Sequence, residues 1–186
     1  MLALMLSERR STRLRDVLSP RPRLLLVGIN PGLRSGAVGH HFAGRGNPFW
    51  RLLHAAGLVP VLLSAEDDQR LAEYGIALTN LCARTTRTAA ELTAAERARG
   101  AAILARKCQR LRPAVIAFVG LGLYQNVFKR TKSGGAGPKG ERFFGAAVFV
   151  VPNPSGLNAS FPGFADKLIW YRRLRSFVER QTSSVG

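Results

Sequence analysis

Cysteine is scarce in this sequence, and the two that occur, Cys82 and Cys108, stand alone. Neither belongs to a CxxC pair, and the three histidines form no cluster beyond the adjacent His40 and His41. A disulfide framework needs several cysteines, and a zinc site needs Cys or His ligands at short, regular spacing. The sequence therefore argues against both, predicts no metal ligand and fits a reducing cytoplasm. Cys82 is most simply a small buried residue.

Long hydrophobic runs are also missing. The opening residues MLALMLSERRSTR are apolar for only a few positions before charged residues begin. Such a stretch is too short to span a membrane and does not match the hydrophobic region of a secretory signal. We therefore expect no membrane partner.

Acidic residues are few, with 11 Asp and Glu against 28 Lys and Arg, so that the formal net charge is +17 at pH 7. An excess of this size suits a polyanionic partner, and nucleic acid before a membrane surface. A GC-rich genome that favours arginine would explain part of this bias but hardly all of it.

Several catalytic motifs are absent as well. The sequence has no Walker lysine and no GxGxxG, so a nucleotide-cofactor loop has little support. It has no GxSxG turn that would carry an acyl-transfer serine. The first predicted strand ends without Asp or Glu, which argues against a paired-carboxylate glycosidase site. We predict no cofactor.

What the sequence does have is the stretch LLLVGINPG, residues 24–32, around which the rest is organised. Its apolar part predicts a buried strand, a Gly-rich loop follows at 33–46, and a helix is expected at 47–56 with Asn47 as its cap. Asn30 then lies at the carboxyl end of a strand, where ligands bind in open α/β sheets. An ordinary strand-to-helix connection would look similar, but the later stretch VFVVPNPSGLN repeats the same plan.

Strands and helices alternate along the chain, which predicts a single α/β domain of three α/β/α layers with a mostly parallel central sheet. Thr93 and Glu96 form a capping box that begins a long helix ending before Pro113. The domain is expected at 23–180, between a basic lead-in at 1–22 and a tail at 181–186. The lead-in is either an arm that touches phosphates or a solvated tail. Further strands are expected at 76–81, 114–119 and 146–151, helices from 66, at 123–128 and at 164–180, and a mobile basic loop at 129–142.

Three of these strand ends meet at one edge of the predicted sheet, carrying GINPG, TNL and PNPSGLN. Their side chains are Asn, Thr and Ser rather than carboxylate, Cys or His. A site built from neutral amides can hold a neutral heterocycle by its edge and fix one water molecule. It cannot strongly activate that water.

GINPG together with NPSGLN resembles the mismatch-specific uracil-DNA glycosylases, bacterial relatives of thymine-DNA glycosylase. The resemblance runs from Arg23 to the last helix and includes the spacing from GINPG through Phe42 to NPFW, the segment TNLCARTT, and the long helix. Commoner uracil glycosylases carry Asp in the first motif and His in the second, which Asn30 and PNPSGLN do not match. The single-strand-selective relatives share Asn-Pro-Gly but use a His-Pro second motif.

The resemblance implies a uracil-DNA glycosylase-like fold and a monofunctional enzyme of base excision repair. Such an enzyme hydrolyses the N-glycosidic bond of uracil, and of related damaged pyrimidines, in duplex DNA, prefers G·U mismatches and flips the base out of the stack. Neither motif contains Lys, so Schiff-base lyase chemistry is not expected. We expect a cytoplasmic, nucleoid-associated monomer. Two other classes stay open: a non-catalytic module that binds DNA lesions, and a nucleoside hydrolase on a similar scaffold.

The resemblance also assigns residues. Asn30 matches the catalytic asparagine that positions the attacking water, which Thr86 helps to hold. Phe42 matches the aromatic residue that stacks on the flipped base, although ordinary core packing is the alternative for this side chain. The expected substrate contacts are Ile29, Gly32, Phe42 and Asn80. The expected DNA contacts are Gly120, Pro154, Ser155, Gly156, Leu157 and Asn158.

Leu157 matches a residue that enters the DNA stack, where it would fill the space left by the flipped base. A loop leucine folded back on the core is the alternative. The sequence departs from the family in two places. His40 and His41 stand where members often carry apolar residues or Pro, so the pocket shape and the substrate range are expected to depart from those of the family. Both, like His54, are more simply surface or hydrogen-bonded residues than catalysts. Asn158 follows where some relatives carry a longer polar side chain, so the mismatch preference is expected to be weaker.

Overall fold

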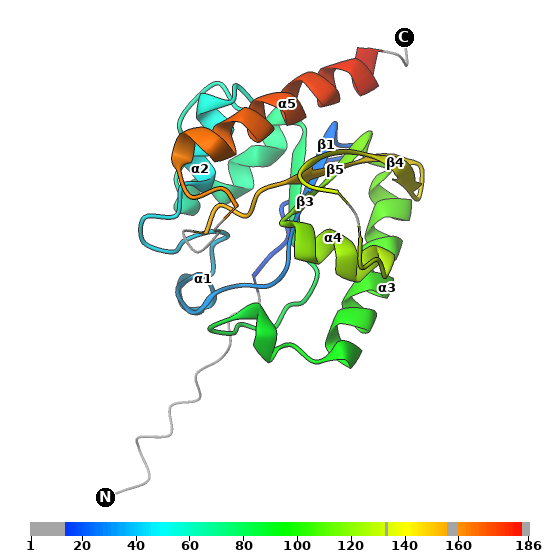
Figure 1. Cartoon of the computed structure of the whole chain (residues 1–186). Helices are drawn as coiled ribbons and strands as arrows, with labels where there is room; N and C mark the ends of the chain where they lie inside the picture. Colours follow the sequence, from blue (N-terminus) through cyan, green and yellow to red (C-terminus); the bar gives the residue numbers. More distant parts are fainter. Residues whose placement is uncertain (1–13, 133, 156–159, 184–186) are drawn as a thin grey trace, which may run out of the picture.

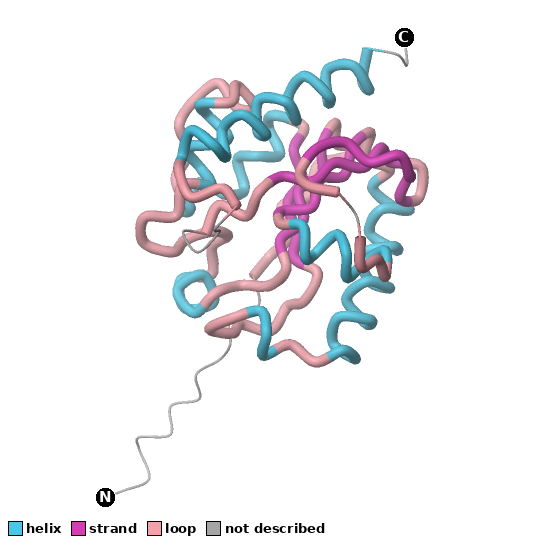
Figure 2. Tube along the Cα trace, viewed as in Figure 1, coloured by secondary structure: helices cyan, strands magenta, loops and turns pink. Residues whose placement is uncertain are grey.

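The computed structural model describes residues 14–132, 134–155 and 160–183 of the chain. Its centre is a five-stranded sheet with the order β2-β1-β3-β5-β4, covered by helices on both faces (Figures 1 and 2). Neighbouring strands are parallel except β4, which runs antiparallel to β5 at one edge. The structure confirms the predicted three-layer α/β domain with a mostly parallel sheet. The strands are β1 (Leu24–Gly28), β2 (Ile76–Asn80), β3 (Val115–Val119), β4 (Gly137–Phe143) and β5 (Ala146–Val151).

The parallel strands are apolar because helices bury them on both faces. Successive side chains of a strand point to opposite sides of the sheet, so β1 contributes to two separate clusters. Leu24 and Leu26 pack with α2 (Phe49–Ala55) and α5 (Phe164–Ser183), while Leu25 and Val27 pack with α3 (Ala94–Leu111) and α4 (Leu121–Phe128). None of the described helices is both long enough and apolar enough to cross a membrane.

Polar side chains form hydrogen bonds at the starts of two helices, close to where the sequence predicts these helices to begin. Thr93 Oγ1 accepts a hydrogen bond from Glu96 N at 3.1 Å, and the Glu96 carboxylate accepts one from Thr93 N, which confirms the capping box of α3. Asn47 Oδ1 accepts from Phe49 N at 3.0 Å, although Pro48 holds the cap position and α2 begins one residue later. The short helix expected from residue 66 is the 3₁₀ helix η1 (Ala65–Tyr74). A second 3₁₀ turn, η2, spans Ala89–Glu91.

Two predicted loops are wrong. The segment 33–46 contains the short helix α1 (Leu33–Val38), and the basic segment 129–142 contains most of β4. The Pro, Gly and charged residues of β4 do not favour a strand, but an edge strand tolerates them because one side of its backbone needs no partner. The helix expected at 123–128 begins earlier, directly after Gly120.

The described part of the basic lead-in, residues 14–22, packs against the free edge of the sheet. Val17 is buried and exchanges two backbone hydrogen bonds with Leu78 of β2, at 2.9 and 3.0 Å. Beside it, Asp16 accepts from Thr79 Oγ1 at 2.7 Å and pairs with Lys107 Nζ of α3 at 2.6 Å. This segment therefore lies next to the strand ends where the site was expected.

Gly100 gives a test of the packing between α3 and the sheet. A Cβ added there would lie 2.3 Å from the backbone oxygen of Leu81, which cannot rotate away. We expect Gly100→Ala to lower the free energy of unfolding by about 1–3 kcal/mol, although alanine favours a helix by about 1 kcal/mol. The measurement is the urea midpoint at unchanged slope. Gly122→Ala in α4 is the matched control, since nothing lies within 4 Å of its added Cβ. Equal stability of the two variants would contradict this packing.

Candidate active site

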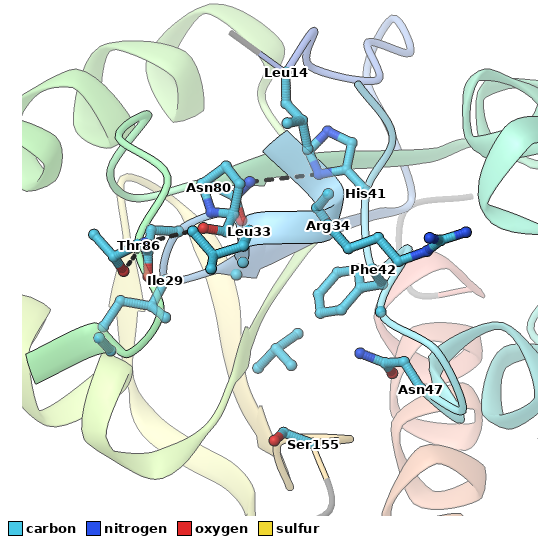
Figure 3. A pocket seen from close by; sticks show the side chains of 18 of the residues that line it. Leu14, Ile29, Leu33, Arg34, His41, Phe42, Asn47, Asn80, Thr86 and Ser155 are labelled. Atoms are coloured by element: carbon cyan, nitrogen blue, oxygen red, sulfur yellow. Dashed lines mark hydrogen bonds between the residues drawn. The ribbon is translucent and has the colours of Figure 1, made fainter. Parts of the chain in front are cut away.

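A pocket of about 420 Å³ opens at the carboxyl ends of β1 and β2. Its wall comes from the turn after β1, the loop after β2, the loop that precedes α2, and the turn after β5 (Figure 3). The predicted strand ends therefore do meet at one edge of the sheet. Residues Ile29, Asn30, Gly32, Phe42, Asn80, Thr86 and Ser155, all singled out in the sequence, line the pocket.

Asn30 is the half-buried amide at the centre of this wall. Its Nδ2 donates to Thr86 Oγ1 at 2.7 Å and to the carbonyl oxygen of Arg84 at 2.9 Å, with Pro31 O further away at 3.3 Å. A carbonyl oxygen can only accept, so these contacts fix which end of the amide is nitrogen. Asn30 Oδ1 makes no hydrogen bond with any residue in the described ranges. The side chain thus offers the pocket a fixed acceptor.

Thr86 holds Asn30 from behind. It is 3 % exposed, and its hydroxyl donates to Thr88 O at 2.8 Å while it accepts from Asn30. Its backbone N donates to Pro31 O at 3.1 Å, which ties the loop after β2 to the turn after β1. The pair predicted to share one water molecule is therefore in direct contact, with the threonine proton turned away from the amide.

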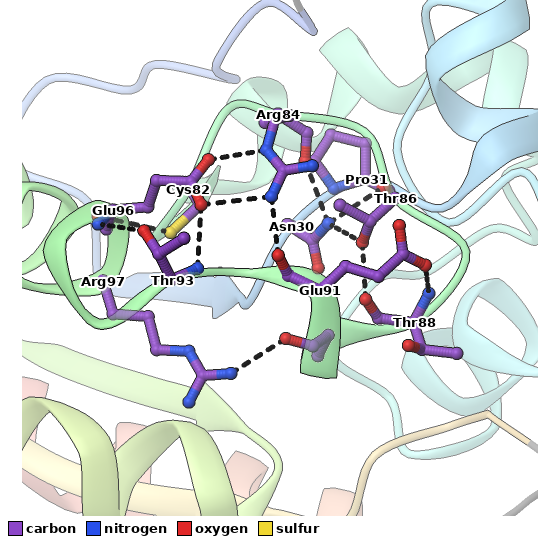
Figure 4. Close-up of polar contacts among 11 residues, drawn as sticks. Asn30, Pro31, Cys82, Arg84, Thr86, Thr88, Glu91, Thr93, Glu96 and Arg97 are labelled. Carbon is purple, nitrogen blue, oxygen red and sulfur yellow. Dashed lines mark hydrogen bonds and ion pairs between the residues drawn. The ribbon is translucent and has the colours of Figure 1, made fainter.

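The loop that carries Thr86 is anchored on α3 by Arg84 (Figure 4). The Arg84 guanidinium donates to both oxygens of Glu96, at 2.5 and 3.1 Å, and to Glu91 O at 2.7 Å. The hydrogen bond from Arg84, with those from Thr93, lowers the pKa of Glu96 to about 2, so the pair stays ionised at neutral and mildly acidic pH. The carbonyl that orients Asn30 is thereby held in place by the helix start.

Phe42 both packs on the hydrophobic core and lines the pocket. Its ring stacks on Phe49 with the centroids 3.8 Å apart and 15° between the planes, so one face packs on the core. It also lines the pocket (Figure 3). Its backbone has a φ of 51°, an unusual conformation for a residue other than glycine. The preceding residue is held by Asp68, whose Oδ2 accepts from His41 N at 3.0 Å.

Gly28 lets Asn80 lie across the end of β1. A Cβ on Gly28 would be 2.5 Å from Asn80 Oδ1 and 3.4 Å from Phe42 Cζ. The Asn80 oxygen and the edge of the Phe42 ring therefore lie close to the same point of the pocket wall.

The predicted DNA-contacting residues are only partly described. Ser155 is exposed at the pocket rim, and its backbone N donates to Asn153 Oδ1 at 3.0 Å. Pro154 is buried, and Gly120 has a φ of 112° at the start of α4, next to Asn153. Gly156, Leu157 and Asn158 lie outside the described residues, so their assignment stays a prediction from the sequence.

Sequence reasoning missed several residues of the site. Asn153 lines the pocket and could have been found, because it belongs to PNPSGLN. Leu14 and Arg15 reach the site from the lead-in, whose charged sequence gives no sign of it. Asp68 was expected only as part of the acidic start of a short helix, but its side chain is 1 % exposed and holds the backbone of His41. His41, expected at the surface or in a hydrogen bond, is buried, and its Nε2 is hydrogen-bonded to the backbone oxygen of Arg15.

The site offers amides, hydroxyls and backbone groups, with Arg34 and Arg87 among the lining residues. Across the part of the chain that the structure describes, no three His, Cys, Asp or Glu side chains come together as metal ligands would. The sequence matches the family model described as the uracil DNA glycosylase superfamily over residues 15–175. That range holds the whole sheet and every residue that lines the pocket except Leu14.

Proposed function

Because this chain belongs to the uracil DNA glycosylase superfamily, we propose that it is a monofunctional, mismatch-specific glycosylase that removes uracil from duplex DNA. Membership of the superfamily makes it a DNA glycosylase, a hydrolase of N-glycosyl bonds that acts in DNA repair. The proposal adds the duplex substrate, the preference for G·U and the residues that act. Mispaired uracil is favoured because it costs least to extrude from the stack.

The observation that carries the proposal is the arrangement of Asn30. Both amide hydrogens are used within the protein, so Oδ1 remains to accept a hydrogen bond from one water molecule in the pocket. An amide is no general base and cannot take the proton from that water. The glycosidic bond therefore breaks ahead of water attack, and hydrogen bonds to the departing uracil anion supply much of the transition-state stabilisation.

The remaining residues hold the flipped base. Phe42 stacks on the ring, Asn80 and the backbone around Ile29 bind its edge, and Gly32 borders it. The pocket volume of about 420 Å³ is within the range of small-molecule sites and leaves room for one pyrimidine. The net charge of +17, with Arg34 and Arg87 beside the pocket, suits a duplex with its phosphates.

A gel assay tests the function with three labelled DNA substrates, which carry uracil opposite guanine, uracil opposite adenine, and uracil in a single strand. We expect abasic product from uracil opposite guanine, less from uracil opposite adenine, and no requirement for a divalent ion. A non-catalytic lesion-binding module would give no product with any substrate. A nucleoside hydrolase would cleave free deoxyuridine and ignore the duplex context. Equal rates on G·U and A·U duplexes would contradict the mismatch preference.

Leu157→Ala tests the proposed wedge. If Leu157 fills the space left by the flipped base, its loss raises the cost of extrusion according to how well the base was paired. We expect single-turnover excision to fall about threefold on G·U, about tenfold on A·U, and hardly at all on single-stranded uracil. Leu62→Ala, at a leucine 60 % exposed and outside the pocket lining, is the control. Equal losses on all three substrates would mean that Leu157 is a packing residue.

A further inference from the structure

His41 joins the base pocket to the lead-in. The imidazole is 2 % exposed and lies against Asn80, with Nδ1 of the ring 3.5 Å from Asn80 Nδ2 (Figure 3). Its other nitrogen, Nε2, is 3.0 Å from the backbone oxygen of Arg15. His41 therefore contacts Asn80, the residue expected to bind the base edge. The proposed reaction gives His41 no role of its own.

The Arg15 carbonyl decides the tautomer of this ring. A carbonyl can only accept, so Nε2 carries the proton and Nδ1 of the neutral ring is an acceptor. An acceptor at Nδ1 attracts the NH₂ end of the Asn80 amide. The Asn80 oxygen is then turned toward the pocket, near Gly28 and Phe42, where a Cβ on Gly28 would be 2.5 Å from it.

We propose that His41 is a positioning residue that fixes the Asn80 amide with Oδ1 toward the base, so that the pocket accepts the uracil edge and rejects the cytosine edge. This inference rests on the proposed function. Uracil presents N3–H as a donor and O4 as an acceptor, which match Asn80 Oδ1 and the second hydrogen on Nδ2. Cytosine presents an acceptor at N3 and a donor at C4, which meet like groups on the same amide.

Protonation of His41 reverses this selection. A proton on Nδ1 would face the Asn80 NH₂ group, donor against donor, and the amide would turn and offer NH₂ to the pocket. Burial lowers the pKa of His41, the Arg15 carbonyl and the carboxylates of Asp68 and Asp16 oppose that shift, and Lys107 supports it. His40, whose Nδ1 is 3.4 Å from Asp68 Oδ2, is a further titratable neighbour among the described residues. The ring is therefore neutral at pH 7 and gains its proton only in acid.

The test measures single-turnover excision of uracil and of cytosine, each placed opposite a tetrahydrofuran abasic analogue so that neither base is paired. We expect His41→Leu to lower the rate of uracil excision about tenfold, as for one lost hydrogen bond. The ratio of the uracil rate to the cytosine rate should fall by a similar factor. In the Asn80→Ala background the same change has no further effect, because His41 acts through Asn80. His40→Leu, an identical change at the adjacent residue, keeps the preference.

The pH dependence of uracil excision, compared between the unmodified chain and three variants, supplies a second measurement. Uracil excision by the unmodified chain falls as the pH drops below the ordinary histidine range, and the fall disappears in His41→Leu, in Asn80→Ala and in His41→Asn. His41→Asn places an acceptor oxygen near the position of Nδ1 and is expected to retain most of the preference for uracil over cytosine. If the loss in His41→Leu came only from poor packing, His41→Asn would lose the preference as well.

Additive losses of uracil excision from His41→Leu and Asn80→Ala would overturn the role of His41. The same conclusion would follow if excision still fell at low pH in all three variants. Either result leaves uracil excision by the unmodified chain intact. Failure of the unmodified chain to release uracil from any DNA would instead overturn the proposed function itself.

Discussion

Asn30→Ala is expected to lower single-turnover excision of uracil from G·U duplex by about two to three orders of magnitude. The change removes the Oδ1 acceptor that is left free in the pocket, and with it the fixed position of the attacking water. Affinity for the duplex should change little, because phosphate contacts supply most of it. Excision and DNA binding measured on the same preparation separate the two effects.

The hydrogen bonds of Asn30 show that the substitution removes a pocket acceptor, and an asparagine elsewhere in the chain serves as the control. Its Nδ2 faces the Arg84 carbonyl and the Thr86 hydroxyl, whose proton is directed to Thr88 O. Asn126→Ala removes the same amide from α4, where it does not line the pocket, and is the matched control. Near-normal excision by folded Asn30→Ala protein would show that this asparagine does not position the water.

Most of the fold could be predicted because its determinants are local. The strand at β5 begins and ends where the apolar run Ala146–Val151 does, and the capping box at Thr93 marks the start of α3. The edge strand β4 could not be predicted, because its residues 137–143 favour a loop and only pairing with β5 makes them a strand. Tertiary pairing here overrides local preference.

The residues of the site could be predicted from local sequence, but the contacts that orient them could not. Asn30, Phe42 and Asn80 belong to recognisable stretches at strand ends, and the structure brings all three to one pocket. The contacts that orient them come from residues far away in the sequence. Asp68 and His41 are 27 residues apart, and His41 and Arg15 are 26 apart, so neither contact leaves a local pattern.

Gly28→Ala should lower uracil excision about a hundredfold, because it displaces Asn80 by a substantial fraction of an ångström. The added Cβ would be 2.5 Å from Asn80 Oδ1, too close for the amide to stay, while Phe42 Cζ at 3.4 Å can remain. The backbone of Gly28 needs no positive φ, so the strand itself accepts alanine. The measurements are the single-turnover rate on G·U duplex and the melting temperature, with Gly122→Ala as the glycine control.

A second substitution shows whether the collision with Asn80 is the cause. Asn80→Ala removes the oxygen that the new methyl group meets, so Gly28→Ala should cost little more in that background than Asn80→Ala does alone. Residues in contact depart from additivity in this manner, whereas independent sites add. If the losses add in full, the methyl group acts through the strand or through Phe42, and Asn80 does not hold the base from the position above Gly28.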